Sequence, residues 1–575
     1  MAIYVVAGTF GRFPWKADEP YSFGIVWEML DRHEWLVPTI AGQPFMEKPP
    51  LVYWLGASFA RTFRWVPPYE ATRLAVVMLL VATLAALDDA ARSLAPEGIR
   101  WLRTFARASP PAREAGPALR LNAILALALA VGTIGFAEHV HKFTADIGQL
   151  AGAMIALAGL VRIGTAATWR ANVVAGLLLG TGAGLAFMSK GLLVPGVLGV
   201  TLTCCFALPR YRTRAAAGAF VASLCAMLPW TIAWPAWLHA ASPALFHEWF
   251  WENNVGRFVG STRLGGNDVP FESRILSLLV MGFPALPLAV ATVVRTAFGA
   301  RREPYAIARE APAHAAVGIY LVFAIVALGA SASMRDIYLL PALPPMILLA
   351  LPTLRAPIRL PACRTFVDAS FVACVAMVVA IWLALVVRGN LPDVPGLRTF
   401  VARWLPLPFS LRVSAVAIAG VLAAVAAWRA VVRNDPLAST TIAWCAGFAT
   451  LWIVASLLLL PWIDAARSYV ATFAALRGEL DTAPGCVGTI NLGESELALF
   501  AYVTRAAPVR AYLGHSGVGK RSRPNEAAFA CPWLLVRSNP TWAPDAPSPA
   551  RWQRVWTGAR PADRSESFAL YRAHG

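Results

Sequence analysis

Charged residues are scarce in this sequence. Only 14% of its 575 residues are Asp, Glu, Lys or Arg, whereas a soluble domain averages about 25%. Hydrophobic residues make up 58%, which excludes a disordered chain and argues against a large soluble enzyme. The sequence also lacks a Walker-type or GxGxxG string in a strand–turn–helix context, so it predicts no nucleotide site.

Long apolar runs are plentiful instead. Each has about the length of a membrane-spanning helix, roughly 20 residues. The runs lie near 71–93, 120–138, 147–162, 172–189, 192–208, 215–238, 274–297, 315–332, 338–354, 366–388, 411–432 and 440–463. The net charge of +18 sits in short connections between them, which is typical of membrane topology rather than of nucleic-acid binding. We expect an all-α polytopic membrane protein with no nucleic-acid partner.

The connections alternate in charge. Every second one is rich in Arg, for example around Arg92, Arg162, Arg210 and Arg309, and such loops stay in the cytoplasm. The other connections are then outside: 14–70, 139–146, 190, 239–273, 333–337, 389–410 and the tail after Asp464. An outward-crossing segment must precede residue 14, yet only Ile3–Phe10 is apolar there. Either a first helix begins upstream or these residues form a partial helix, giving about thirteen helices.

The tail differs in composition from the rest. Residues 464–575 carry more charge, Pro and Ser than the predicted membrane domain, 1–463. Cys486–Asn491, Pro532–Val536 and Ser567–Arg572 read as strands and Glu496–Arg505 as a helix, which predicts a small α/β domain. Its cysteines, Cys486 and Cys531, either pair on the outer side or remain two buried thiols.

Ionisable residues gather in the predicted outer loops. They are Asp18, Glu47, Lys48, Asp146, Lys190, Arg257, Arg335 and Tyr338, from separate connections that charge bias places on one side. Ionisable groups near a membrane usually face a cavity or pathway, so this set predicts a cleft for an anionic lipid head. For Arg335 alone, a snorkelling anchor is the simpler interpretation, and Glu19 reads as an exposed loop carboxylate.

Two further features have open interpretations. His139-Val-His141 is a weak metal signal, and Glu47 is a weak metal candidate as well, so a divalent metal stays an open cofactor. Glu494 either pairs with a basic site residue or favours a helix N-terminus.

The first outer loop resembles a known family. Asp18-Glu19-Pro20 followed by Glu47-Lys48-Pro49-Pro50-Leu51-Val-Tyr53-Trp54 is similar to the loop of GT-C glycosyltransferases in the aminoarabinose lipid A transferase and protein O-mannosyltransferase group. The resemblance extends to Asp146, Lys190-Gly191, Asn254–Phe258 and Tyr338–Pro341, over roughly residues 1–350. It implies about thirteen helices and a periplasmic C-terminal domain.

The resemblance also implies an activity. Family members move a sugar from a polyprenyl phosphate to lipid A or another envelope acceptor at the outer face of a bacterial inner membrane. By position, Asp18 and Asp146 would be catalytic. Lys48, Lys190, Arg257 and Tyr338 would bind the donor phosphate, and Glu19, Glu47, Asn254 and Arg335 would line the pocket. Direct attack by the acceptor predicts inversion at the anomeric carbon.

Two departures from the family pattern leave the sugar, aminoarabinose-like or mannose-like, open. Tyr21 directly follows Pro20, where aminoarabinose transferases usually have Arg, and Asn254 stands where they tend to have His. Protein O-mannosylation is the main enzymatic alternative. A lipid or sugar transporter or flippase is the alternative from another class, but it predicts charges near mid-helix and inverted repeats, and the sequence shows neither.

Overall fold

The computed structural model describes residues 1–104, 115–256, 269–300, 309–330, 334–355, 361–390, 414–435, 439–480, 485–513, 523–538, 548–561 and 566–574. Within these residues, nine helical segments are long and apolar enough to cross a membrane. They are α4–α5 (Pro68–Trp101), α8 (Ala145–Thr165), α9 (Trp169–Lys190), α11 (Arg214–Ala241), α17 (Pro312–Gly329), η3–α18 (Asp336–Arg355), α19 (Pro361–Val386), α21 (Ala415–Arg433) and α22 (Thr440–Leu458).

The other predicted apolar runs also form helices, but shorter or bent ones. α6 (Ala115–Gly132) and α10 (Leu193–Cys205) are short, while α14 (Phe271–Met281) and α15 (Ala285–Ala300) meet at a bend of 92°. The run predicted to end near residue 138 divides into α6 and α7 (Ile134–His139). Before residue 14, the chain forms the short helix α1 (Ala2–Val6). Most of the predicted loop 389–410 lies outside the described residues.

Helices α8 and α9 pack with their backbones nearly in contact. A Cβ atom on Gly152 would lie 2.4 Å from the backbone nitrogen of Ala186, and one on Gly159 would lie 2.5 Å from that of Leu179. Small residues allow this close approach between membrane helices, where lipid removes the hydrophobic drive for association. The pairing sets the start of α8 beside the end of α9, which positions two predicted site residues.

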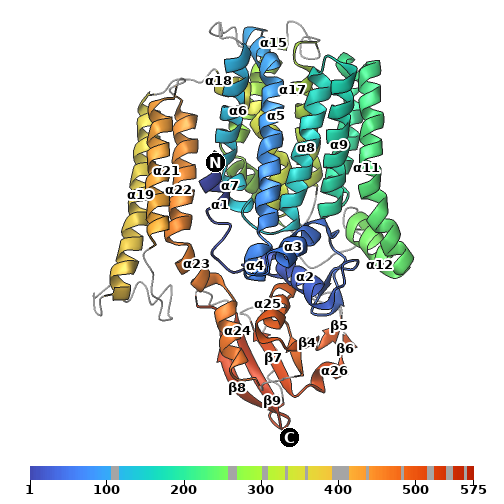
Figure 1. The fold of residues 1–575 in the computed structure, drawn as a ribbon, viewed down its shortest axis with the longest axis vertical. Coiled ribbons are helices and arrows are strands. Elements are labelled where there is room, and N and C mark those ends of the chain that lie inside the picture. The colour runs from blue at the N-terminus through green and yellow to red at the C-terminus, as the bar shows by residue number, and fades with distance from the viewer. Residues whose placement is uncertain are drawn as a thin grey trace.

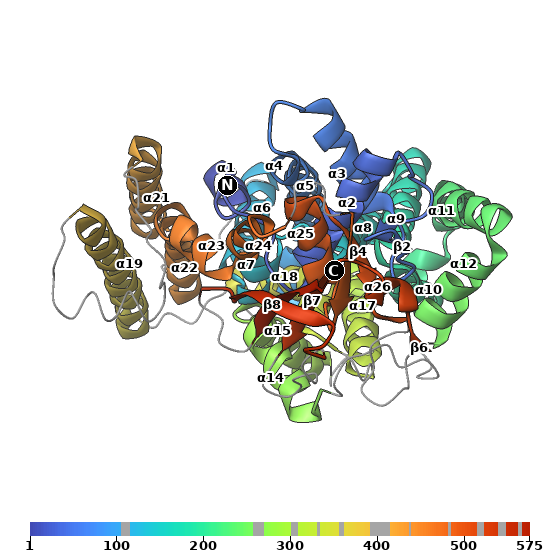
Figure 2. The same cartoon turned by 90° about the horizontal axis from the view of Figure 1, so that it is seen from below.

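Three membrane helices form a group of their own. α19, α21 and α22 lie to one side of the main bundle (Figures 1 and 2) and share a separate apolar cluster that includes Trp382 and Trp428. Trp444 on α22 connects the group to the bundle, because its indole N–H donates to the Gly132 carbonyl at 3.0 Å.

The first loop folds into a layer between the bundle and the C-terminal domain (Figure 1). It contains α2 (Asp18–Arg32), a short hairpin of β1 (Thr39–Ile40) and β2 (Gln43–Pro44), and α3 (Leu51–Thr62). At 12 residues, α3 is too short to span a membrane. Phe23 on α2 packs into the core of the C-terminal domain, so this loop joins the two parts of the molecule.

The tail forms a small sheet domain. Its five strands run in the order β4-β3-β7-β9-β8, with bounds β3 (Cys486–Ile490), β4 (Ala507–Arg510), β7 (Trp533–Ser538), β8 (Trp552–Gly558) and β9 (Ser567–Ala573). Helices α24 (Val470–Arg477) and α25 (Glu494–Thr504) accompany the sheet, with a hairpin of β5 (Tyr512–Leu513) and β6 (Arg523–Pro524) and the short α26 (Glu526–Phe529) at its edge. The predicted strands β3, β7 and β9 and helix α25 are confirmed, and Cys486 pairs with Cys531. β4 and β8 are additional strands.

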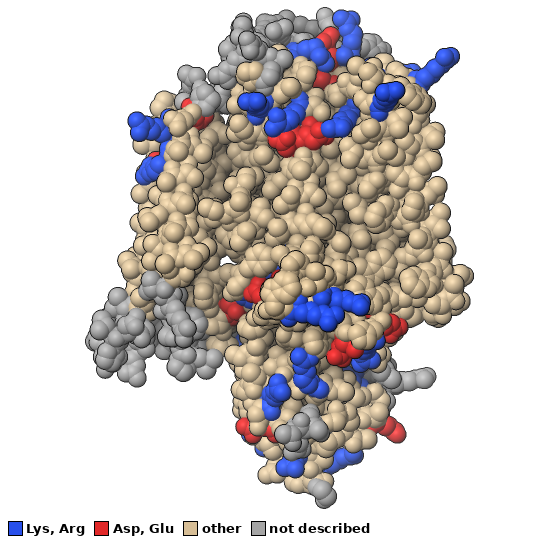
Figure 3. Space-filling model, in the orientation of Figure 1, with Lys and Arg blue, Asp and Glu red and all other residues tan. Residues whose placement is uncertain are grey.

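Charge divides the molecule into bands. In Figure 3, Lys and Arg gather at the end opposite the C-terminal domain and again around that domain, with a mostly uncharged band between them. At the far end, connections that the sequence assigns to one side contact each other: Arg162 pairs with Asp89, and Arg100 lies 3.8 Å from Glu310. The chain is a multi-pass membrane protein.

Candidate functional site

Asp18 begins helix α2 and is paired with Arg335. The Arg335 guanidinium donates to both carboxylate oxygens, with N···O distances of 2.9 Å and 2.8 Å. Asp18 is 8% exposed, whereas the Arg335 side chain is 46% exposed. The predicted interpretation of Arg335 as an isolated anchor is therefore wrong, because its charge is committed to Asp18.

Asp146 and Lys190 form a second ion pair. Asp146 lies in the first turn of α8 and Lys190 at the end of α9, and their side chains are in contact. Each charge suits its helix end, since the N-terminus attracts anions and the C-terminus attracts cations. The Lys190 ammonium also lies 3.6 Å from the centre of the Tyr338 ring, so three distant segments meet at this lysine.

Lys48 interacts electrostatically with both acids, Asp18 and Asp146. Its ammonium is hydrogen-bonded to the Tyr21 hydroxyl, and the residue is 7% exposed. Burial opposes the charge, but Tyr21, Tyr53, Asp18 and Asp146 outweigh it and raise the pKa of Lys48. Lys48 is therefore a buried cation within electrostatic reach of both carboxylates.

Asp18 stays ionised in this setting. Burial raises the pKa of its carboxyl, but Lys48, Arg335 and Lys190 lower it by more, so the net pKa is below the ordinary value. A carboxylate with a lowered pKa is a weak base. Asp18 is thus better suited to stabilising a nearby positive charge than to acting as a general base.

A cavity of about 460 Å³ opens on the Asp18 side of this group. Its lining includes Asp18, Arg335, Lys16, His139 and Lys142. Lys142 is loosely paired with Glu138 at 3.9 Å. The cavity has room for a polar group next to Asp18, on the face where Arg335 contacts the carboxylate.

Comparison with known proteins gives a consistent result. The chain is 23% identical over 342 residues to the undecaprenyl phosphate-alpha-4-amino-4-deoxy-L-arabinose arabinosyl transferase of Pectobacterium carotovorum subsp. carotovorum, covering 59% of this chain and 55% of that protein. It is 25% identical over 350 residues to the protein of the same name from Pseudomonas savastanoi pv. phaseolicola, covering 58% and 56%. The chain spans about half the length of these curated relatives. No protein-family model matches it.

Solved structures decide the fold. ArnT from Cupriavidus metallidurans bound to undecaprenyl phosphate superimposes with a TM-score of 0.62 at 17% identity, over 99% of this chain and 96% of that one. The same protein in the apo state gives 0.59. The chain has the GT-C fold. The predicted fold class is confirmed, with the C-terminal sheet domain in place.

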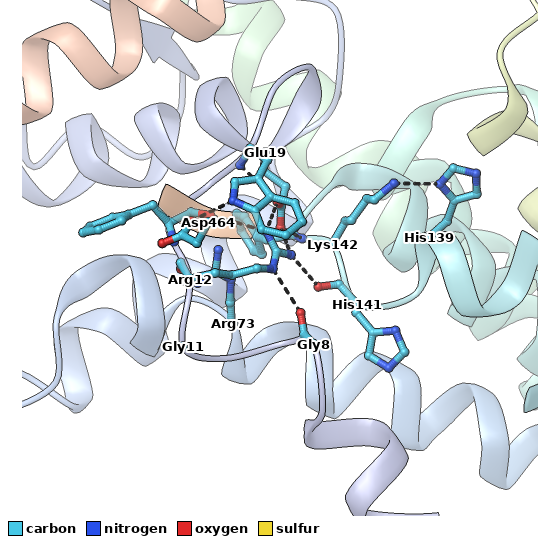
Figure 4. Close-up of polar contacts among 12 residues, drawn as sticks. Gly8, Gly11, Arg12, Glu19, Arg73, His139, His141, Lys142 and Asp464 are labelled. Atoms are coloured by element: carbon cyan, nitrogen blue, oxygen red, sulfur yellow. Dashed lines mark hydrogen bonds and ion pairs between the residues drawn. The ribbon is translucent and has the colours of Figure 1, made fainter. Parts of the chain in front are cut away.

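Glu19 is a buried residue that connects the first loop to the helix bundle. Its carboxylate pairs with Arg12 and accepts hydrogen bonds from the backbone nitrogens of Phe143 at 3.0 Å and Trp15 at 3.2 Å. Both charged side chains are nearly fully buried, at 2% and 3% exposure. Figure 4 shows Arg12 reaching Glu19 and the His141 carbonyl. The prediction that Glu19 is an exposed loop carboxylate is wrong, because it joins the first loop to the bundle.

The remaining predicted residues lie in different settings. The Asn254 amide donates to the Trp249 carbonyl at 2.9 Å and its oxygen accepts from the Leu192 backbone nitrogen at 3.4 Å, so it supports the chain just after α9 and Lys190. Glu47 is partly buried and lies near the C-terminal domain, where its charge adds to burial in raising the pKa of Glu494 to about 7. Among the described residues, Glu494 has no ion pair. Arg257 lies outside the described residues.

The His and acidic side chains at this site do not fit a divalent metal. His139 and His141 have different surroundings. The His139 ring contacts Lys142 at 3.3 Å (Figure 4), whereas the His141 ring nitrogens contact the carbonyls of Tyr4 and Ala137. Among the described residues, no group of three or more His, Cys, Asp or Glu side chains could hold an ion. Asp18 and Asp146 are already compensated by Arg335 and Lys190, so we derive no step through a metal.

Sequence reasoning did not find Tyr21 or Lys16. Tyr21 occupies the position after Pro20 where the resembled family has Arg, and that departure was its only signal. In the structure its hydroxyl contacts Lys48. Lys16 lines the cavity and pairs with carboxylates more than 400 positions later in the chain. A local sequence pattern cannot predict a contact over such a distance.

Proposed function

We propose that this chain is a membrane glycosyltransferase acting on a lipid-linked sugar. The donor is a polyprenyl phosphate carrying aminoarabinose or a similar sugar, and the acceptor is lipid A or another envelope glycoconjugate. The reaction takes place at the periplasmic face of a bacterial inner membrane, which is also the side of the C-terminal domain. The curated relatives and ArnT bound to undecaprenyl phosphate support this choice of donor.

One observation carries the proposal. Asp18, Lys48, Lys190 and Tyr338 come from four distant segments, yet they form one charged group at the same end of the bundle. Fixed cations in a poorly hydrated site stabilise developing negative charge without reorganisation when the reaction occurs. A lipid phosphate leaving group needs that kind of stabilisation.

We assign the donor phosphate to the cationic side of the group. Lys48 and Lys190 act as point charges. The Tyr338 ring stabilises the Lys190 ammonium through a cation–π contact. Arg257 is a further donor-binding candidate from the sequence. Asp146 holds Lys190 in place and acts through that lysine.

Asp18 faces the cavity with an ionised carboxylate. Because its pKa is lowered, it suits an acceptor that is already ionised, such as a phosphate of lipid A, better than a neutral hydroxyl that must lose a proton. We assign Asp18 to orient the acceptor and to stabilise positive charge on the sugar ring. Direct attack then inverts the anomeric carbon.

The test is a defined reaction in proteoliposomes. The purified chain is incubated with undecaprenyl-phosphate aminoarabinose and lipid A, and mass spectrometry detects the modified lipid, with inactive Asp18→Asn protein as the control. Transfer to lipid A supports the proposal. Transfer of mannose to a peptide instead would identify a protein O-mannosyltransferase, and movement of the intact donor between leaflets without product would identify a flippase; either outcome overturns it.

A further inference from the structure

The two residues before Asp18 are held by the C-terminal domain. The Lys16 ammonium lies 2.7 Å from the Glu496 carboxylate and 3.1 Å from that of Glu566. The Ser495 hydroxyl donates to the Ala17 carbonyl, a contact between positions 478 residues apart. The backbone that leads directly into the candidate catalytic residue is therefore fixed from the opposite end of the chain.

The carboxylates that receive Lys16 belong to a closed cluster. Glu496 and Glu566 have side chains only 2% exposed. The Tyr469 hydroxyl donates to Glu566 at 2.6 Å, and Arg537 and Arg560 donate to the same carboxylate at 2.9 Å and 2.8 Å. Buried carboxylates require such partners. Lys16 is the member of this cluster that comes from the first loop.

Charge balance in the cluster does not depend on Lys16. Arg537 and Arg560 by themselves offset the two carboxylates, so replacing Lys16 removes a connection and leaves no uncompensated buried acid. The cluster therefore has one more cation than its own charge requires. That extra cation lies two residues before Asp18.

Contacts on either side of Lys16 and Asp18 also join the first loop to the C-terminal region. Asp464, at the beginning of the tail, accepts hydrogen bonds from the Phe13 backbone nitrogen at 3.0 Å and the Trp15 indole at 2.7 Å. Just after Asp18, Gly24 on α2 lies against Ala498 on α25. The segment around Asp18 is thus attached to the C-terminal region on both sides.

We infer that Lys16 and Ser495 are positioning residues for Asp18, and that the C-terminal domain is an integral part of the transfer site. This inference rests on the proposed function and deepens it. A catalytic group displaced by about 1 Å can lose about 100-fold in rate. The contacts of Lys16 and Ser495 hold Asp18 next to the cavity and within reach of the cations Lys48 and Lys190.

The experiment measures kcat and KM separately for Lys16→Met and Ser495→Ala in the proteoliposome reaction. We expect each variant to lower kcat, by about 10-fold for Lys16→Met, while KM for the donor stays within about twofold. Lys16→Arg should recover most of kcat, because a guanidinium can also bridge the two carboxylates. If Lys16→Met fails to fold, Ser495→Ala still tests the attachment, because it removes the separate hydrogen bond from the C-terminal domain to the Ala17 carbonyl.

Asn525→Ala is the matched control in the same domain. It removes the cap of α26 and the hydrogen bond to the Arg510 carbonyl at 2.9 Å but touches no residue near Asp18. An equal loss of kcat in this control would show a general effect of domain destabilisation and overturn the inference.

The remaining outcomes are distinct. An active wild-type protein with unchanged kcat in both Lys16→Met and Ser495→Ala overturns the inference alone. A raised KM for lipid A in Lys16→Met, with Ser495→Ala unaffected, would make Lys16 a substrate ligand and also overturn positioning. A folded wild-type protein without any transfer to lipid A contradicts the proposed function instead.

Discussion

At the scale of single residues, two adjacent acids have different partners. Asp18 and Glu19 are neighbours in sequence, but consecutive positions on a helix point in different directions. The Asp18 carboxylate pairs with Arg335, whereas the Glu19 carboxylate pairs with Arg12, and both residues contribute to the cavity wall. Asp18 is therefore the acid that we propose for the reaction, whereas the buried pair of Glu19 with Arg12 supports the fold.

The pair gives a matched prediction. Asp18→Asn should abolish transfer with little change in unfolding temperature, because its partner Arg335 is half exposed and can be solvated. Glu19→Gln should destabilise the fold by about 3–5 kcal/mol, because the Arg12 charge stays buried without its carboxylate. Tryptophan fluorescence during heating in detergent measures the second effect. A stable Glu19→Gln protein, or an active Asp18→Asn protein, would contradict these roles.

Glu494 makes stability depend on pH. Burial and the neighbouring Glu47 raise its pKa from 4.5 to about 7. An acid with a raised pKa favours the folded state at low pH, and this contribution is lost as the pH rises from about 4.5 to 7. Glu494→Gln should therefore match wild type at pH 4 and be more stable at pH 8, by up to about 3 kcal/mol.

The measurement compares unfolding of wild type and Glu494→Gln across this pH range. Glu479, which is exposed, provides the control: Glu479→Gln should differ from wild type by the same unfolding free energy at every pH. A constant difference for Glu494→Gln as well would show that this carboxyl does not titrate in the window.

At the scale of elements, the site depends on a few close helix contacts. α8 and α9 bring Asp146 to Lys190 because glycines permit their backbones to approach. α2 and α25 bring the C-terminal domain to the segment that carries Asp18. In both cases the helices themselves are local features, but the candidate site residues lie where two helices meet.

The α2–α25 contact can be tested by exchanging one methyl group. A Cβ atom on Gly24 would lie 2.4 Å from the Ala498 Cβ, so Gly24→Ala should destabilise the protein by about 1–3 kcal/mol through overpacking. Adding Ala498→Gly restores the space and should recover stability and transfer, less the cost of glycine in a helix, about 1 kcal/mol. Thermal unfolding and the transfer assay measure both; a further loss in the double variant would contradict the contact.

At the scale of the whole molecule, charge sorts the chain into two faces. Basic side chains gather at the end opposite the C-terminal domain (Figure 3), whereas the segment that leads into Asp18 contacts that domain. Retention of positive loops in the cytoplasm would place the site in the periplasm.

Cysteine labelling tests that orientation. In a background lacking the free cysteines Cys204, Cys205, Cys225, Cys363, Cys374 and Cys445, a membrane-impermeant maleimide should label Glu526→Cys in intact spheroplasts. It should label Arg309→Cys, whose native side chain is 86% exposed, only after permeabilisation. The reverse pattern would invert the topology.

The sequence by itself determined the membrane helices and much of the candidate site. Apolar runs of membrane length must form helices because lipid offers no other partners for backbone groups, and in the described residues each predicted run lies on one helix or on two consecutive helices. The Asp-Glu-Pro and Glu-Lys-Pro-Pro strings indicated Asp18 and Lys48, because those motifs are local. The disulfide stayed undecided between two alternatives, since pairing depends on where two distant cysteines meet.

Only the tertiary structure decided which charges pair. It assigned Arg335 to Asp18, Glu19 to Arg12 and Lys16 to Glu496 and Glu566. These contacts join positions far apart in the chain, or turn neighbours to opposite sides of one helix, so no spacing in the sequence encodes them. Helix formation follows from local hydrophobicity, whereas the partner of a buried charge is set by the packing of the whole molecule.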